Sequence, residues 1–118
     1  MLEPRNEVLL VDDDDVDREV VRRLLTSQHI VCEAATAAEA LIAAQERRPD
    51  FVLLDYRLPD LDGLQLLPYF TLAEIPVIIL TGEESPEVIV QAMQQGAQNY
   101  LVKHNLTQIS LVHAISGA

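Results

Sequence analysis

The chain of 118 residues is long enough for one domain with a single hydrophobic core, and its formal net charge of -11 disfavours direct binding to nucleic acid or to an anionic membrane. Cys32 is the only cysteine, which excludes an internal disulfide and a cysteine-rich zinc site and fits a reducing cytoplasm. No apolar stretch approaches the roughly 18 residues of a membrane-spanning helix, so we expect a cytoplasmic protein.

The first predicted elements are a strand, a helix and a second strand. The apolar run over residues 8–11 predicts a buried strand, and residues 30–34 predict another. Between them, the spacing of apolar residues predicts a helix that ends near Gln28 and buries one face, which contains Val16, Val20, Val21, Leu24 and Leu25.

A helix with a capping signal comes next. Thr36 and Glu39 form the pattern of a capping box, which predicts an alanine-rich helix that stops before Pro49. The apolar run over residues 51–54 then predicts the third strand.

Two prolines bear on the helices that follow. Pro68 falls inside a helix predicted to begin at Asp62, and it should kink or shorten that helix. Ser85 and Pro86 come after a strand predicted over residues 77–80, and they are typical of a helix start. The buried face of this helix is expected to contain Val88, Ile89, Ala92 and Met93.

The last part of the chain completes an alternating pattern. Gly96 is expected to end the preceding helix, and residues 100–102 predict a fifth strand. A short final helix is predicted from Leu106, Ile109, Leu111, Val112 and Ile115. Five apolar strands that alternate with helices indicate a parallel sheet covered on both faces, because a parallel strand is reached only through a crossover.

Chemically active residues follow four of these strands. Asp12 and Asp13 follow the first strand, Asp55 the third, Thr81 the fourth and Lys103 the fifth. Parallel sheets bind ligands at the edge formed by the carboxyl ends of their strands. Carboxylates gathered there repel one another, and a hard cation such as Mg2+ relieves that repulsion. The residues alone leave two interpretations open, a metal-assisted phosphoryl site and a plain acidic rim.

Four segments together resemble the receiver domain of bacterial two-component response regulators. They are VDDDDVDR at residues 11–18, LLDYRLPDLDG at 53–63, ILTG at 79–82 and YLVK at 100–103. The resemblance implies a flavodoxin-like α/β fold, with a five-stranded parallel sheet in the order 2-1-3-4-5 and helices on both faces. It also implies that residues 1–118 form one receiver domain, which we expect to be part of a longer signalling protein.

The resemblance assigns a phosphoryl-accepting role to Asp55. Asp12 and Asp13 would form the acidic pair, and Mg2+ would be held by Asp13, by Asp55 and by the backbone carbonyl of Arg57, with Asp12 acting through water. Arg57 and Glu83 lie two residues beyond Asp55 and Thr81, so we expect both to tune the lifetime of the phosphate.

The remaining roles concern switching. By resemblance, Thr81 is the switch hydroxyl, Tyr100 the switch aromatic and Lys103 the lysine that contacts the phosphoryl group, while Gly82 keeps the entrance open. The expected partners are a sensor histidine kinase or a histidine phosphotransfer protein, and a downstream output domain or protein. A homodimer through the helix that begins at Pro86, the strand over residues 100–102 and the final helix is also consistent with the family.

Two rival functions are a degenerate receiver that only binds proteins, and an aspartate-nucleophile Mg2+ phosphatase. The phosphatase would need a second aspartate two residues after Asp55, where Arg57 stands. A calcium loop beginning at Asp13 fails because Arg18 and Leu24 replace the required glycine and glutamate. His104 follows the lysine where the family usually has a cis proline, so we expect no cis bond there.

Overall fold

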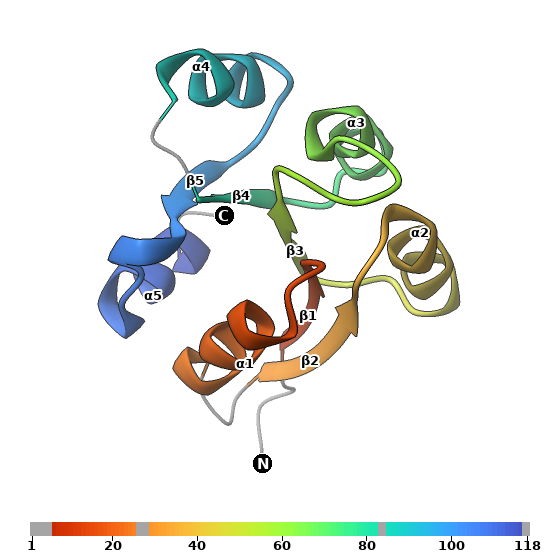
Figure 1. Cartoon of the computed structure of the whole chain (residues 1–118). Helices are drawn as coiled ribbons and strands as arrows, with labels where there is room; N and C mark the ends of the chain where they lie inside the picture. Colours follow the sequence, from red (N-terminus) through yellow and green to blue (C-terminus); the bar gives the residue numbers. More distant parts are fainter. Residues whose placement is uncertain (1–5, 26–28, 83–84, 117–118) are drawn as a thin grey trace.

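The computed structural model describes residues 6–25, 29–82 and 85–116 (Figure 1). Within these residues, five strands alternate with five α-helices and one short 3-10 helix. In chain order they are β1 (Asn6–Val11), α1 (Asp15–Leu24), β2 (His29–Ala34), α2 (Ala37–Glu46), β3 (Phe51–Asp55), α3 (Gly63–Leu72), β4 (Val77–Thr81), α4 (Pro86–Gln94), β5 (Asn99–Val102), η1 (Lys103–Asn105) and α5 (Gln108–Ser116).

The strands form one parallel sheet in the order β2-β1-β3-β4-β5, which confirms the predicted flavodoxin-like fold. Helices α2, α3 and α4 pack on one face, while α1 and α5 pack on the other (Figure 1). Alternate residues of each central strand therefore enter two different cores, because successive side chains of a strand point to opposite faces. This is why the central strands are continuously apolar.

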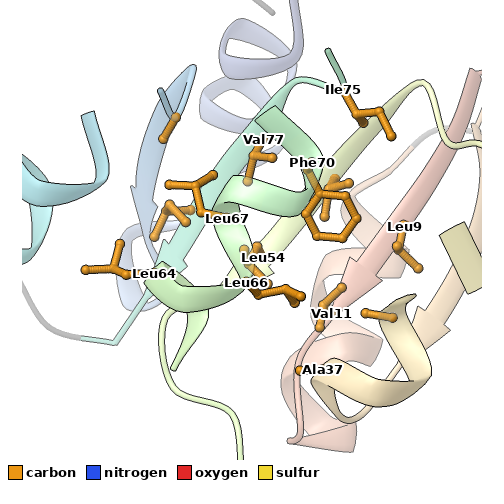
Figure 2. Packing of buried hydrophobic residues seen from close by; sticks show 14 of the residues in the cluster. Leu9, Val11, Ala37, Leu54, Leu64, Leu66, Leu67, Phe70, Ile75 and Val77 are labelled. Atoms are coloured by element: carbon orange, nitrogen blue, oxygen red, sulfur yellow. The ribbon is translucent and has the colours of Figure 1, made fainter. Parts of the chain in front are cut away.

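The core beneath α3 is the larger of the two clusters (Figure 2). Leu66, Leu67 and Phe70 of α3 are almost fully buried there against Leu9 and Leu54 of the sheet. Burial of an apolar side chain of this size stabilises a fold by about 1.5 to 3 kcal/mol. This packing fixes β1 and β3, whose ends carry Asp12 and Asp55.

Pro68 was expected to kink or shorten α3, and it does not shorten it. The helix continues for four residues beyond the proline and, at 10 residues, is as long as α1 and α2. Pro68 is exposed, so the disturbed part of the backbone ladder faces away from the core. Asp62 and Gln65 form a full capping box at the start of this helix, which the sequence analysis had not identified.

The box predicted for α2 forms only in part. The hydroxyl of Thr36 accepts a hydrogen bond from the Glu39 backbone N–H at 3.1 Å, but the Glu39 carboxylate meets the Thr36 hydroxyl and not its backbone. The predicted helix start at Ser85 and Pro86 is confirmed, since Ser85 is the N-cap residue of α4 and Pro86 its first residue, although the Ser85 side chain makes no capping hydrogen bond.

The predicted apolar faces of three helices are only partly correct. Each helix buries a narrower stripe than expected, because it meets the sheet along one line and its flank is open to solvent. The residues that are exposed against expectation are Val16 and Val20 of α1, Met93 of α4, and Ile109 and Val112 of α5. Leu25, Ala92 and Leu111 are buried as predicted.

Two further expectations concern the backbone and the membrane. None of the described residues has a cis peptide bond, in line with the expectation for Lys103-His104. Among these residues, no helix combines the length and the apolar character that crossing a membrane would require.

Candidate phosphoacceptor site

Four polar side chains meet at the carboxyl edge of the sheet because the strands that carry them are parallel and adjacent. Asp12 follows β1, Asp55 ends β3, Thr81 ends β4, and Lys103 follows β5. Asp12, Asp55 and Thr81 are buried, with exposures of 0%, 6% and 2%. Buried polar groups are costly, so their collection at one edge is typical of a functional site.

A pocket of about 290 Å³ opens over this edge. Its lining brings together most of the predicted site residues, and consists of Asp13, Asp55, Tyr56, Arg57, Leu58, Pro59, Thr81, Gly82 and Lys103. A Cβ atom on Gly82 would meet no atom within 4 Å, so the space beside this residue is open. Asp12 is not part of this lining, but it forms an ion pair with Lys103, which is.

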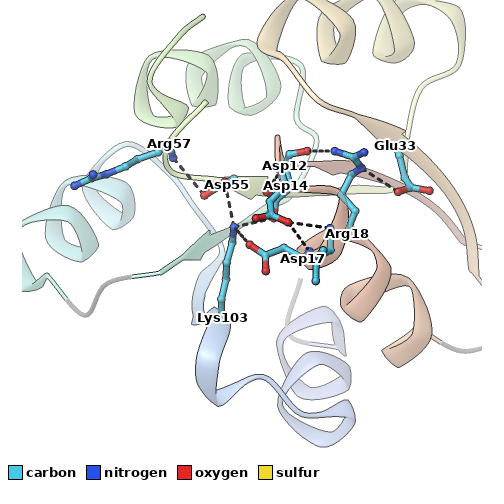
Figure 3. A network of polar contacts seen from close by, with 9 residues as sticks. Asp12, Asp14, Asp17, Arg18, Glu33, Asp55, Arg57 and Lys103 are labelled. Atoms are coloured by element: carbon cyan, nitrogen blue, oxygen red, sulfur yellow. Dashed lines mark hydrogen bonds and ion pairs between the residues drawn. The ribbon is translucent and has the colours of Figure 1, made fainter. Parts of the chain in front are cut away.

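The ammonium group of Lys103 lies among three carboxylates (Figure 3). Its Nζ atom is 2.8 Å from Asp12 Oδ2, 3.0 Å from Asp17 Oδ2 and 3.2 Å from Asp55 Oδ2. Burial by itself would lower the pKa of Lys103, but the close carboxylates of Asp12, Asp17 and Asp55 outweigh it and raise the pKa. The lysine therefore stays charged.

Asp55 titrates unusually high for an aspartate. Its pKa is raised from 3.8 to about 6, mainly by burial and also by the charge of Asp12, while the charge of Lys103 and the hydrogen bonds from Lys103 and the Arg57 N–H oppose this rise. The Arg57 backbone N–H donates to Asp55 Oδ1 at 3.3 Å. The ionised form of Asp55 is therefore destabilised in the fold even with Lys103 beside it, and an additional cation would stabilise that form.

Asp12 is held by the turn that follows it and by Arg18. Its Oδ1 accepts a hydrogen bond from the Asp14 N–H at 3.0 Å, and the Arg18 guanidinium donates to its backbone carbonyl at 2.6 Å. Arg18 also pairs with Glu33 of β2 (Figure 3). The sequence analysis did not identify Arg18, whose position is set by the first two turns of α1.

The acid run after β1 divides into two roles. Asp14 caps α1, since its Oδ1 accepts from the N–H groups of Val16 and Asp17. Asp17 reaches Lys103, because residues one turn into α1 face the end of β5.

The loop between β3 and α3 is fixed by contacts that hold the end of β3 in place. The Gly63 N–H donates to the Tyr56 carbonyl at 2.7 Å, and a side chain at Gly63 would collide with the Asp55 carbonyl. Asp60 accepts hydrogen bonds from the N–H groups of Ala37 and Ala38 at the start of α2, which ties this loop to the neighbouring helix.

The donor set suits a hard cation. One carboxylate oxygen from each of Asp12, Asp13 and Asp55 lies within 4.8 Å of the others. Asp13 is exposed, and Asp12 Oδ2 is buried with no hydrogen-bond partner beyond its ion pair with Lys103. Mg2+ binds through one or two carboxylates and retains waters, so these residues fit a magnesium site. A ligand role for the Arg57 carbonyl stays a prediction.

The other predicted residues lie at the rim or beyond it. The side chain of Arg57 extends away from Asp55 and Lys103 (Figure 3). Tyr100 is 36% exposed and lines a separate hollow between α4 and β5. Thr81 pairs in register with Val102, two residues after Tyr100. Glu83 lies outside the described residues.

Comparison with known proteins gives consistent matches across nearly the whole chain. The family model described as the response regulator receiver domain matches residues 8–116. A relative named probable transcriptional regulatory protein NarL, from Mycobacterium tuberculosis, is 36% identical over 113 residues, covering 92% of this chain and 52% of that protein. The chain thus spans about half the length of that relative.

Solved structures show the same similarity. The signal receiver domain of the putative response regulator NarL from Mycobacterium tuberculosis matches with a TM-score of 0.87 and 33% identity, covering 97% of this chain and 95% of that one. The chemotaxis protein CheY4 of Vibrio cholerae matches with a TM-score of 0.84 and 29% identity, covering 95% of this chain and 97% of that one.

Proposed function

The chain belongs to the response regulator receiver domain family, whose members are signalling switches, and we propose that it is switched by transfer of a phosphoryl group to Asp55. The observation that carries this proposal is the position of Asp55, a buried carboxylate 3.2 Å from the Lys103 ammonium and beside the acidic pair. A carboxylate is a good acceptor when it is held rigid and its charge is balanced.

The proposed reaction is an in-line displacement. An Oδ atom of Asp55 attacks the phosphorus of a phosphohistidine, a new P–O bond forms, and the P–N bond breaks with its electron pair returning to the imidazole. Phosphoryl transfer requires mainly positioning and charge neutralisation. Lys103 supplies one positive charge to the phosphoryl oxygens, and Thr81 supplies a hydroxyl at the neighbouring strand end. Arg57, at the rim, controls the approach of water.

Magnesium completes the charge balance in this proposal. The ion would be held by Asp13 and Asp55, with Asp12 close by, and it would neutralise the oxygens of the transferred group. A sensor histidine kinase or a histidine phosphotransfer protein would donate the group, and an output domain or protein would respond to it.

The two rival functions are less well supported. An aspartate-nucleophile phosphatase needs a general acid two residues after the nucleophile, and here Arg57 stands there with its side chain turned away. A degenerate receiver would not need to keep Asp55, Lys103 and the acidic pair together in one site.

The proposal is tested by incubating the chain with acetyl phosphate, a small phosphodonor. We expect one phosphoryl group per chain by intact mass when Mg2+ is present, and none when EDTA removes it. Uptake that does not depend on Mg2+ would contradict the metal site, and no uptake under any condition would favour the degenerate receiver.

Mg2+ is also expected to raise the melting temperature, because a ligand that binds only the folded state stabilises it. Asp13→Asn should raise the melting temperature without metal by removing repulsion from Asp12 and Asp55, and should abolish both the Mg2+ effect and phosphoryl uptake. The measurement is thermal unfolding with and without Mg2+. The matched control is Asp15→Asn, which removes an exposed charge outside the acidic cluster. An equal melting temperature of the wild type with and without Mg2+ would refute the metal site.

Phosphorylation should change the surface formed by α4, β5 and α5. Thr81 lies beside β5, and Tyr100 of that strand lines the hollow next to α4. Movement of the Thr81 hydroxyl towards a phosphoryl oxygen would let Tyr100 turn and repack this surface. We expect amide exchange in α4 and β5 to differ between the free and the beryllofluoride-bound chain. Changes confined to the loops around Asp55 would contradict a switch.

A further inference from the structure

We propose that Asp17 is a positioning residue that holds the Lys103 ammonium over Asp55 and thereby sets the rate of phosphoryl transfer. The inference rests on the phosphoacceptor role proposed for Asp55, and it adds a residue that the sequence pattern had not placed in the site. Its basis is the 3.0 Å contact between Lys103 Nζ and Asp17 Oδ2, which joins residues 86 positions apart.

The ammonium group of Lys103 is surrounded by three carboxylates. An ammonium group has three N–H bonds, and among the described residues the carboxylates of Asp12, Asp17 and Asp55 lie within ion-pair distance of it. The ammonium donates hydrogen bonds to Asp17 and to Asp55, and it forms an ion pair with Asp12 (Figure 3). A flexible lysine side chain is thus oriented before any phosphoryl group arrives, which reduces the ordering cost of the transition state.

Asp17 differs from the other two acceptors in its chemistry. Asp12 and Asp55 belong to the acidic cluster that suits a cation, and Asp55 is the nucleophile, which becomes phosphorylated in the reaction. Asp17 lies outside this cluster, so its carboxylate stays available to Lys103 while the other two are engaged. Among the carboxylates that the structure describes around Lys103, Asp17 is therefore the anchor that neither binds the cation nor takes part in the reaction.

The backbone under Asp17 is itself well fixed. Asp17 lies in the first turn of α1, and its N–H donates to the capping carboxylate of Asp14 at 3.1 Å. Val21, one turn further along, is buried under the sheet. The side chain of Asp17 is 40% exposed, compared with 18% for Lys103, so it approaches the ammonium from the solvent side. Replacing it should change the site without disturbing the core.

The test compares initial rates of phosphorylation by acetyl phosphate with Mg2+ in four single variants. Asp17→Asn should be slower than wild type by about threefold to tenfold, because asparagine keeps an acceptor oxygen but turns a charge-assisted hydrogen bond into an ordinary one. Asp17→Glu should recover part of the rate. Asp15→Asn, which removes the same charge from the same helix turn without a contact to Lys103, should match wild type. Lys103→Gln gives the background for a double-mutant cycle.

The cycle separates positioning from a general structural effect. If Asp17 acts through Lys103, Asp17→Asn should have no further effect in the Lys103→Gln background, because the interaction is already lost. Equal rates for Asp17→Asn and Asp15→Asn would overturn the inference. So would a slowing by Asp17→Asn that persists unchanged when Lys103 is absent.

A second readout does not depend on phosphorylation. Lys103 is the only lysine of the chain, so its side-chain ammonium gives a single assignable nitrogen signal in NMR spectra. We expect proton exchange from this ammonium to be slow in wild type and Asp15→Asn and faster in Asp17→Asn. If the exchange changes while no variant takes up phosphate, the proposed function fails and the anchoring contact stands. An unchanged exchange rate in Asp17→Asn would show that Asp17 does not hold the Lys103 ammonium.

Discussion

Replacing Asp55 by asparagine is expected to raise the free energy of unfolding above about pH 7, without metal, and to have little effect below about pH 4. The folded pKa of Asp55 is about 6 and its ordinary value is 3.8. Because the folded chain binds this proton more tightly than the unfolded chain, stability falls as pH rises through this window. A pKa raised this far corresponds to roughly 3 kcal/mol, an order-of-magnitude figure for a buried carboxylate.

The measurement is urea unfolding of wild type and Asp55→Asn in EDTA at several pH values. The gap between the two proteins should open between about pH 4 and pH 6 and stay constant above that window. Asp15→Asn is the matched control, since its exposed carboxylate should give no comparable gap. A gap that is independent of pH, or a less stable asparagine variant at pH 8, would show that Asp55 is not electrostatically strained.

Replacing Lys103 by methionine should have the opposite effect on stability and a larger one on function. Methionine preserves the apolar stem but leaves Asp12 and Asp55 as buried carboxylates without their cation. Loss of one partner from a buried ion pair costs about 3 to 5 kcal/mol, and protonation of the carboxylates should reduce this at acidic pH. Phosphoryl uptake should fall by at least about a hundredfold, as for loss of a charged transition-state contact.

The matched control for this variant is Arg23→Met. It removes the same charge from an exposed side chain that pairs with Glu19 on the surface of α1. Exposed pairs of this kind contribute at most about 1 kcal/mol, so Arg23→Met should keep both stability and uptake. If Lys103→Met is as stable as the control at neutral pH, the lysine does not balance the buried carboxylates.

The sequence pattern was sufficient to locate the strand ends, because a buried run that stops at a polar residue marks the surface of a parallel sheet. Asp12, Asp55, Thr81 and Lys103 were placed at one edge in this way, and the strand order followed from the family resemblance. The boundaries differed slightly, since Asp55 and Thr81 belong to β3 and β4 and do not simply follow them.

The roles of Asp17 and Arg18 could not be predicted, because they depend on how α1 is rotated against the sheet. Both lie in an acid-rich helix start where solvated side chains are the usual case. Their contacts with Lys103 and with the Asp12 carbonyl connect residues through the packed fold. The same rotation explains why Val16 and Val20 are exposed despite their helical spacing.

The most direct test of the account is the location of the phosphoryl group. Wild type and Asp55→Asn are incubated with acetyl phosphate and Mg2+, and the modified residue is located in peptides by mass spectrometry after borohydride reduction of the acyl phosphate. We expect one modification, at Asp55, and none in Asp55→Asn at equal Mg2+. A modification on another residue of the wild type, or one that persists in Asp55→Asn, would contradict the central claim.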